Sequence, residues 1–419
     1  MKVLHIIHRY PPYYMAGSEV YTDNLARELS KHTEISIFTR IENPFENSYT
    51  YFDENGGSIR IRRINKPNRD YSLKDKYLDE TIDDAFLSYV KQVNPDIIHI
   101  DHLSHLSTNI VQIAKEEFDL PIIFTIHDFW LFCCRGQLID PFKIICGGPS
   151  EENCFNCLKN LLRDISLEDI RDYQDHMRNV INQIDLFLSP SMFLKRFFEN
   201  NGVPDSKIIY SPYGFNKDAI KYKNKQYDSS SKINFGFLGR IIPEKGIDIL
   251  LKAFCSSLGG NSKLLIFGDN GSVRNYLDWY ANANVVFKGG FDNRDINQVL
   301  QQIDVLVVPS IWYENSPLVI QEAFLAGIPV ITSNIGGMAE LVKDGINGLT
   351  FEVGNIDDLR NKIQHIQNNP TILNEIKPSR NDVRSIEEDA LNIHSLYQEL
   401  CKDETCTIQK VRRTLADNL

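Results

Sequence analysis

Two acidic side chains flank a helix-start pattern in residues 314–322, whose sequence is ENSPLVIQE. Asn315 or Ser316 suits an N-cap and Pro317 suits the first helical position, so we expect a helix to begin here with unpaired backbone N–H groups. Such a helix end attracts a diphosphate. Glu322 lies about 7.5 Å along the helix axis from Pro317, whereas Glu314 stays in the preceding loop. The two carboxylates therefore bracket an anion site and accept hydrogen bonds from sugar and ribose hydroxyls; a surface helix with ordinary acidic residues is the alternative.

Residues 239–246, with the sequence GRIIPEKG, form a second polar stretch between an expected strand and an expected helix. They bring two cations, Arg240 and Lys245, to the carboxyl end of a strand, which is where open α/β sheets bind ligands. Cations in that position neutralise negative charge on a departing phosphate group. Two solvated loop charges are the alternative interpretation.

A loop-like segment rich in Gly and Pro carries four cysteines, Cys134, Cys146, Cys154 and Cys157. The last two are separated by two residues, the spacing of a metal knuckle, and four thiolates hold zinc in tetrahedral geometry. A structural zinc is therefore one hypothesis for this segment. Buried thiols without a metal are the alternative, since Cys133 competes with Cys134 and a second Cys-x-x-Cys pair is missing.

Short apolar runs alternate with amphipathic helical patterns along the chain, which indicates an α/β protein with parallel sheets covered by helices. Each half is expected to form one doubly wound, Rossmann-like domain. The expected strands of the first half are Val3–Ile7, Ile35–Thr39, Ile97–Ile100, Ile122–Ile126 and Leu186–Ser189, and those of the second are Ile233–Leu238, Lys263–Phe267, Val285–Phe287, Val305–Val308 and Val330–Thr332.

The same patterns predict the domain organisation of the 419 residues, a length that favours two hydrophobic cores. A polar stretch over 221–232 follows the expected junction between the domains. We expect an N-terminal domain over 1–212 with a cysteine-containing insertion near 133–160, a C-terminal domain over 213–385, a helix over 386–405 that packs back on the first domain, and a tail over 406–419.

Composition excludes some classes of function. The net charge of -11 argues against a nucleic-acid-binding protein, which needs an excess of basic residues facing phosphates. No apolar run approaches the roughly 20 residues that span a bilayer. We expect a cytoplasmic protein, with contact to the inner face of a membrane left open, and thiols or metal ligands rather than disulfides.

Together the two polar stretches resemble the donor site of glycosyltransferase family 4, whose pattern is Gly-Arg-x-x-Pro-Glu-Lys-Gly followed by Glu-x7-Glu. The similarity extends over nearly the whole chain. It includes Ala16-Gly17-Ser18-Glu19, Thr125-Ile126-His127-Asp128, Phe267-Gly268-Asp269, Gly327-Ile328-Pro329-Val330, Gly336-Gly337 and Glu340. The resemblance implies two Rossmann-like domains facing a cleft, the GT-B arrangement.

The resemblance also implies roles for individual residues. Arg240 and Lys245 hold the donor diphosphate, Glu322 the ribose and Glu314 the transferred sugar. From the opposite side of the cleft, Gly17 approaches the phosphates and His127 contacts the sugar. Glu314, His127, Arg240 and Lys245 are thus the expected catalytic residues, and the donor-binding residues are Gly17, Gly239, Arg240, Lys245, Ser316, Pro317, Leu318, Val319 and Glu322.

Two positions depart from the family pattern. The usual Gly-Gly before the first helix is Ala16-Gly17, and the usual Asn-Gly at the domain junction is replaced within Tyr213-Gly214-Phe215-Asn216. Neither change removes a charged group, so they affect the shape of loops more than the class of reaction.

By the resemblance, the expected activity is sugar transfer with retention and without a required cofactor, from a UDP- or GDP-sugar to a glycan or a lipid-linked acceptor. The setting is synthesis of a cell-surface polysaccharide or glycolipid. A nicotinamide-dependent dehydrogenase is excluded because neither domain carries Gly-x-Gly-x-x-Gly after its first strand. A nucleotide-sugar epimerase of the same fold and a non-catalytic sugar- or nucleotide-binding relative remain alternatives.

Overall fold

A computed structural model of the chain describes residues 1–67, 72–257, 262–269, 280 and 284–402. The chain divides into two compact units. In the described residues, unit 1 comprises 1–138, 146–214 and 386–402, and unit 2 comprises 139–145 and 215–385. The chain passes between the units at 214/215 and 385/386, and the short segment 139–145 of the predicted insertion groups with unit 2. The predicted tail, 406–419, lies outside the described residues.

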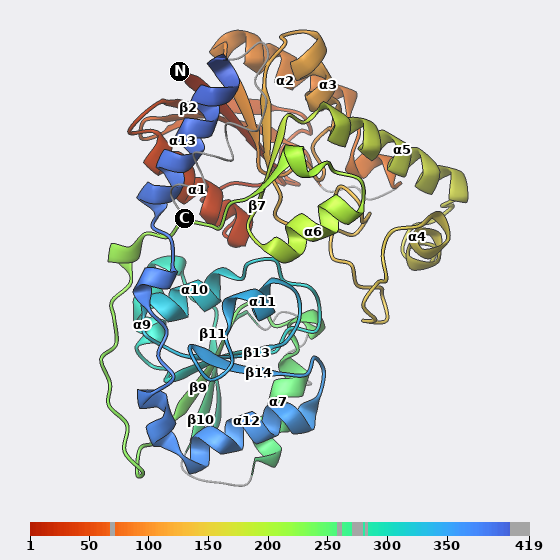
Figure 1. The fold of residues 1–419 in the computed structure, drawn as a ribbon. Coiled ribbons are helices and arrows are strands. Elements are labelled where there is room, and N and C mark those ends of the chain that lie inside the picture. Colours follow the sequence, from red (N-terminus) through yellow and green to blue (C-terminus); the bar gives the residue numbers. More distant parts are fainter. Residues whose placement is uncertain (68–71, 258–261, 270–279, 281–283, 403–419) are drawn as a thin grey trace. The chain divides into compact units, whose positions relative to one another are not determined.

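Unit 1 contains an eight-stranded sheet in the order β3-β4-β2-β1-β5-β6-β7-β8 (Figure 1). Its pairs are parallel apart from the β3–β4 hairpin. The strands are β1 Lys2–Ile7, β2 Glu34–Ile41, β3 Tyr51–Gly56, β4 Ile59–Asn65, β5 Ile97–Ile100, β6 Ile122–Thr125, β7 Leu186–Ser189 and β8 Ile208–Tyr210. Strands β1, β5, β6 and β7 are buried along almost their whole length, as expected for parallel strands with helices on both faces.

The helices of unit 1 begin at polar caps in several cases. Asp79 accepts hydrogen bonds from the backbone N–H groups of Thr81 and Ile82 at the start of α2, and Ser166 forms a capping box with Asp169 at the start of α5. The helices are α1 Gly17–Leu29, α2 Glu80–Val93, α3 Asn109–Glu116, α4 Glu151–Leu158, α5 Leu167–Gln183, α6 Met192–Asn200 and α13 Ile386–Lys402. Helix α13 packs against α1 within this unit.

Unit 2 contains a parallel sheet in the order β11-β10-β9-β12-β13-β14. Its strands are β9 Asn234–Leu238, β10 Lys263–Phe267, β11 Val285–Gly289, β12 Val305–Val308, β13 Val330–Ser333 and β14 Gly348–Phe351. Its helices are α7 Ile247–Ser256, α9 Ile296–Leu300, α10 Leu318–Leu325, α11 Gly336–Leu341 and α12 Ile356–Asn368. Strand order reverses between β9 and β12, so this doubly wound sheet has its topological switch point there.

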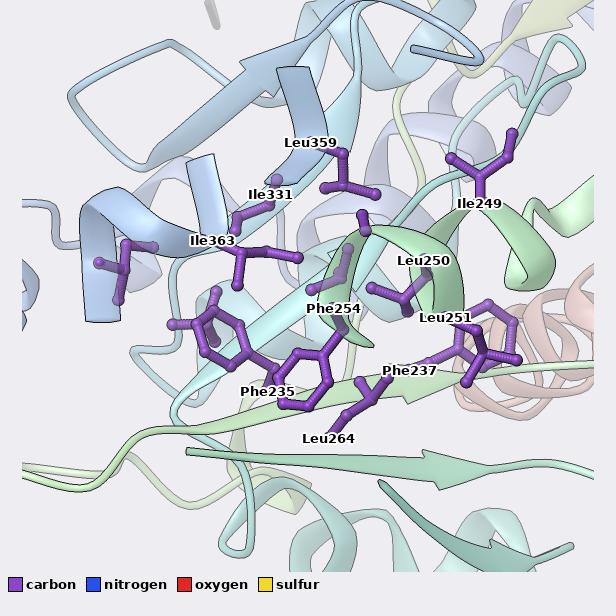
Figure 2. Packing of buried hydrophobic residues seen from close by; sticks show 14 of the residues in the cluster. Phe235, Phe237, Ile249, Leu250, Leu251, Phe254, Leu264, Ile331, Leu359 and Ile363 are labelled. Carbon is purple, nitrogen blue, oxygen red and sulfur yellow. The ribbon is translucent and has the colours of Figure 1, made fainter. Parts of the chain in front are cut away.

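The core of unit 2 lies under two helices of one layer. Phe235 and Phe237 of β9 pack with Leu250 and Phe254 of α7 and with Ile363 of α12 (Figure 2). Figure 1 shows α7 and α12 on one side of the sheet and α9, α10 and α11 on the other. The apolar face of each helix therefore covers one face of the sheet, and the loops at the carboxyl ends of the strands are left to carry polar groups.

Every strand expected from the sequence is present, with ends shifted by a few residues at most. The α/β class is confirmed. Strands β3, β4, β8 and β14 were not expected. In β3 the side chains are largely exposed, so the apolar pattern that marks a buried strand is missing and pairing with β4 is what orders it.

Candidate active site

The switch point of unit 2 brings the two polar stretches of the sequence to one edge of the sheet. Residues 239–246 follow β9 and residues 309–317 follow β12, and these two strands are hydrogen-bonded neighbours. Backbone contact fixes their approach, since the N–H of Ile311 donates to the carbonyl oxygen of Glu244 at 2.9 Å. The crevice at such a point is where doubly wound sheets bind ligands.

Three donors converge on one oxygen of Glu314 in this crevice. Oε1 accepts hydrogen bonds from Nζ of Lys245 at 2.6 Å, Nε1 of Trp312 at 2.7 Å and Oγ of Ser310 at 2.8 Å. Nζ of Lys245 also lies 5.6 Å from the centre of the Trp312 ring. Within the described ranges no donor contacts Oε2, so that oxygen remains for a ligand.

The charge state of Glu314 follows from these contacts. Burial alone raises the pKa of its carboxyl, but the positive charge of Lys245 and the hydrogen bonds from Lys245, Trp312 and Ser310 outweigh burial and hold the pKa below its ordinary value. Glu314 is therefore ionised at neutral pH. It forms an ion pair with Lys245, in which both side chains keep some exposure to solvent, 12% for Glu314 and 22% for Lys245.

Glycines allow the backbones around this pair to approach closely. The N–H of Gly337 donates to the carbonyl oxygen of Glu314 at 2.8 Å, and a Cβ on Gly337 would lie 1.6 Å from the carbonyl oxygen of Asn315. Gly246 has a φ of +67°, and a Cβ there would lie 2.0 Å from the carbonyl oxygen of Pro309. Both positions therefore require glycine, and they hold the loops that carry Glu314 and Lys245.

Helix α10 begins one residue later than predicted. Pro317 is its N-cap, with φ of -61° and ψ of 117°, and Leu318 is the first helical residue. The prediction of an Asn315 or Ser316 cap was wrong because the Ser316 hydroxyl pairs with Nε2 of Gln321 at 3.1 Å instead of a helix N–H. No side chain caps the helix, which leaves its first N–H groups, including those of Leu318 and Val319, open to an anion.

Glu322 and Arg240 both lack protein partners in the described part of the chain. The half-buried carboxyl of Glu322 accepts no hydrogen bond there, and burial raises its pKa to about 7. The Arg240 side chain is exposed after β9, next to Gly239, and forms no described ion pair. A hydroxyl donor for Glu322 and an anion for Arg240 are the ligand groups that would satisfy them.

The predicted residues of the first domain belong to unit 1. Gly17 is exposed and starts α1, where Ala16 is an N-cap without a side-chain hydrogen bond. His127 follows β6, and its side chain is only 6% exposed. Its Nδ1 lies 2.5 Å from the Tyr213 hydroxyl and its Nε2 3.8 Å from Oδ1 of Asp101. Nothing in the local sequence indicates these two contacts.

The four cysteines of the zinc hypothesis are only partly brought together. Cys134 and Cys154 are buried and hydrogen-bonded to each other, and this bond lowers the pKa of Cys154 below its ordinary value. Cys157 contacts Nη1 of Arg135 at 4.0 Å, and Sγ of Cys146 donates to the carbonyl oxygen of Gly148. In the described residues no group of three or more His, Cys, Asp or Glu side chains is arranged to hold a metal. The zinc site stays a prediction.

Two family models match the chain and together cover almost all of it. The model for Glycosyltransferase Family 4 matches residues 15–218, and the model for Glycosyl transferases group 1 matches residues 218–384. The first therefore covers most of unit 1, and the second covers the crevice described above.

Curated relatives agree with these matches. A Klebsiella pneumoniae protein encoded in a cps region is 30% identical over 46% of this chain and 54% of its own length. A glycosyltransferase of Methanocaldococcus jannaschii is 30% identical over 52% and 60%. An Escherichia coli UDP-Gal:α-D-GlcNAc-diphosphoundecaprenol α-1,3-galactosyltransferase is 31% identical over 44% and 48%. The chain thus spans little more than half the length of the first two.

The fold is shared with solved structures at low sequence identity. Sucrose-phosphate synthase from Thermosynechococcus elongatus superimposes with a TM-score of 0.74 at 19% identity, over 95% of this chain and 98% of that one. HepE of Anabaena, solved in complex with UDP-glucose, has a TM-score of 0.60 at 18% identity, and both chains are covered completely.

Among the helices of the described ranges, none combines the length and the apolar composition that a membrane span needs.

Proposed function

The chain belongs to glycosyltransferase family 4, and from this premise we propose that it transfers a sugar, with retention, from a UDP- or GDP-sugar to a glycan or lipid-linked acceptor. The observation that carries the proposal is the ionised Glu314 held by Lys245, Trp312 and Ser310 at the switch point of unit 2. A fixed carboxylate and a fixed ammonium group next to an uncapped helix N-terminus suit a ligand that carries hydroxyls on one side and a diphosphate on the other.

The donor is expected to occupy this crevice with its diphosphate at the start of α10. The first N–H groups of the helix, Lys245 and the exposed Arg240 would bind the phosphates. Glu322 would accept hydrogen bonds from the ribose hydroxyls, and Oε2 of Glu314 would accept from the sugar. HepE with bound UDP-glucose and the galactosyltransferase that uses UDP-Gal support a UDP-sugar as the first donor to test.

The chemistry follows from charge. The bond between the anomeric carbon and the diphosphate oxygen breaks, a bond to the acceptor oxygen forms on the same face, and the acceptor proton passes to the departing diphosphate. Negative charge grows on the nucleoside diphosphate, where Lys245 and Arg240 stabilise it without a divalent metal. Glu314 would hold the sugar and keep the Lys245 ammonium group in place.

Synthesis of a cell-surface polysaccharide or glycolipid is the proposed setting, in the cytoplasm at or near the inner face of the membrane. Support comes from the names of two relatives, the protein of a Klebsiella cps region and the galactosyltransferase acting on a diphosphoundecaprenol-linked sugar. The acceptor would then be a lipid-linked or growing glycan. Peripheral contact with the membrane is part of this proposal.

A nucleotide-sugar screen tests the proposal. Purified protein is mixed with UDP-, GDP- and ADP-sugars, with and without EDTA, while nucleoside diphosphate release and thermal shift are followed. We expect one base to stabilise the protein and to support release that EDTA does not abolish. Arg240→Ala and Glu322→Ala should lose the response, whereas Arg294→Ala, which removes an arginine that is 89% exposed, should keep it.

The alternatives predict different results in the same screen. Stabilisation by a nucleotide sugar without release or conversion, even when acceptor fractions are added, would indicate a binding protein. Interconversion of the sugar without release of nucleoside diphosphate would indicate an epimerase. No response to any nucleotide sugar would refute the proposed donor site.

A further inference from the structure

A buried polar network lies at the carboxyl edge of the sheet in unit 1, around His127. The carboxylate of Asp101, at the end of β5, is fully buried and accepts a hydrogen bond from Nδ1 of His5 at 3.0 Å. His99 is also fully buried, and burial lowers its pKa to about 3, so it is neutral. Its two nitrogens pair with Tyr397 and Thr125. The network is rich in hydrogen bonds that fix ring orientations.

Within this network the ring of His127 lies between Tyr213 and Asp101. Its Nδ1 lies 2.5 Å from the hydroxyl of Tyr213, and its Nε2 lies 3.8 Å from Oδ1 of Asp101. At 3.8 Å the two atoms do not form a hydrogen bond, but the negative charge of Asp101 favours a hydrogen on the ring nitrogen that faces it. Tyr213 is almost completely buried, which raises its pKa far above the ordinary value and keeps the hydroxyl as a donor for Nδ1.

Tyr213 is held by one direct ring contact and by neighbours that are themselves anchored to Asp389. Its ring packs at 4.2 Å from the ring of Tyr21 in α1. The hydroxyl of Tyr21 donates to Oδ2 of Asp389 at 2.9 Å, and the backbone N–H of Gly214 donates to the same oxygen at 2.9 Å. Helix α13, which carries Asp389, thus anchors the residue that follows Tyr213. Tyr213 and Gly214 belong to the segment 213–216, one of the two places where the sequence departs from the family pattern.

We infer that Tyr213 is a positioning residue that fixes the orientation and the Nε2–H tautomer of His127, with Asp101 on the other side of the ring. The inference rests on the proposed function and on the family resemblance, which implies that His127 contacts the transferred sugar. His127 stands at the carboxyl end of β6, where the hydrogen bond with Tyr213 and the charge of Asp101 favour one orientation of its ring. Loss of the Tyr213 hydroxyl would release Nδ1 and let the ring turn.

Tyr213→Phe tests the inference, with Tyr397→Phe as a matched control. Each variant removes one buried hydroxyl that lies 2.5 Å from Nδ1 of a histidine, but the hydroxyl of Tyr397 contacts His99 and, at 3.4 Å, His5 instead of His127. Imidazole ¹⁵N spectra would be recorded with the His127 signals assigned from a His127→Asn variant. We expect the wild-type protein to show the Nε2–H tautomer at His127, Tyr213→Phe to lose it, and Tyr397→Phe to keep it.

Turnover and stability complete the test. Tyr213→Phe should lower kcat about tenfold or more, since misplacement of a reacting group by about 1 Å can cost a hundredfold. Tyr397→Phe should lower the Tm by a similar amount and leave kcat within about twofold of the wild type. If Tyr213→Phe keeps the His127 tautomer, or matches Tyr397→Phe in kcat while His127→Asn is inactive, the inference is wrong. If wild-type protein turns over no nucleotide sugar, the proposed function fails, and the spectra still decide whether Tyr213 orients His127.

Discussion

Glu322→Gln offers a quantitative test of the crevice in unit 2. Burial raises the pKa of this carboxyl from 4.5 to about 7, and the described residues supply no hydrogen bond to offset it. Each pKa unit corresponds to about 1.4 kcal/mol, so ionising Glu322 at neutral pH costs the folded state at most roughly 3 kcal/mol relative to the unfolded chain. A buried carboxyl kept without a protein partner is a feature that function, not stability, explains.

The sign of the pH dependence follows from the direction of the shift. The folded protein keeps the proton on Glu322 up to about pH 7, whereas the unfolded chain loses it near pH 4.5. Between these values the unfolded state binds fewer protons, so wild-type stability falls as pH rises. The amide of the Glu322→Gln variant cannot ionise, so the variant escapes this loss. We expect the free energy of unfolding of Glu322→Gln, minus that of the wild type, to increase by about 2.5 kcal/mol from pH 5 to pH 8.

Urea denaturation at several pH values, followed by tryptophan fluorescence, measures this difference. Any cost of burying the amide is the same at every pH and drops out of the comparison. Glu375→Gln, at an exposed site of unit 2, is the control and should show a difference that does not change with pH. A pH-independent difference for Glu322→Gln as well would show that the Glu322 carboxyl is not buried as described.

Three further predictions concern the donor site and the cysteines. Lys245→Met should lower kcat/KM about a hundredfold to a thousandfold, because it removes the positive charge that stabilises the leaving diphosphate. Lys252→Met, at an exposed position of α7, is the control and should keep its activity, so equal turnover of the two variants in a donor-release assay would contradict the role of Lys245. Gly337→Ala should abolish nucleotide binding in calorimetry, because the Cβ of the alanine would lie 1.6 Å from the carbonyl oxygen of Asn315 in the loop that carries Glu314. Far-UV circular dichroism should still show a folded protein, and an unaltered affinity would argue against this contact. Elemental analysis of protein purified without chelator should find about one equivalent of zinc if the four-thiol site forms, and less than half an equivalent would reject it.

Local sequence was sufficient to predict most elements, and the two polar stretches that it singled out meet at the switch point of unit 2. Buried parallel strands such as β12 are visible as apolar runs, and Pro317 marked the helix start to within one residue. The exposed strand β3 and the three-residue β8 carry no such signal, because their order comes from pairing with neighbours. Ser310 and Trp312 lie directly after β12, yet nothing in their spacing says that both point at Glu314.

The sequence by itself determined the two α/β halves, the cationic loop after β9 and the paired glutamates around α10, because strand and helix patterns and loop chemistry are local properties. Only the tertiary structure decided how these residues meet. The reversal of strand order between β9 and β12 puts Lys245 against Glu314 across 69 residues of chain. Folding also buries Asp101 and Tyr213 against His127, which are 26 and 86 residues away from it in sequence. Ion pairs, ring orientations and shifted pKa values depend on distance and burial, and those exist only once the chain has folded.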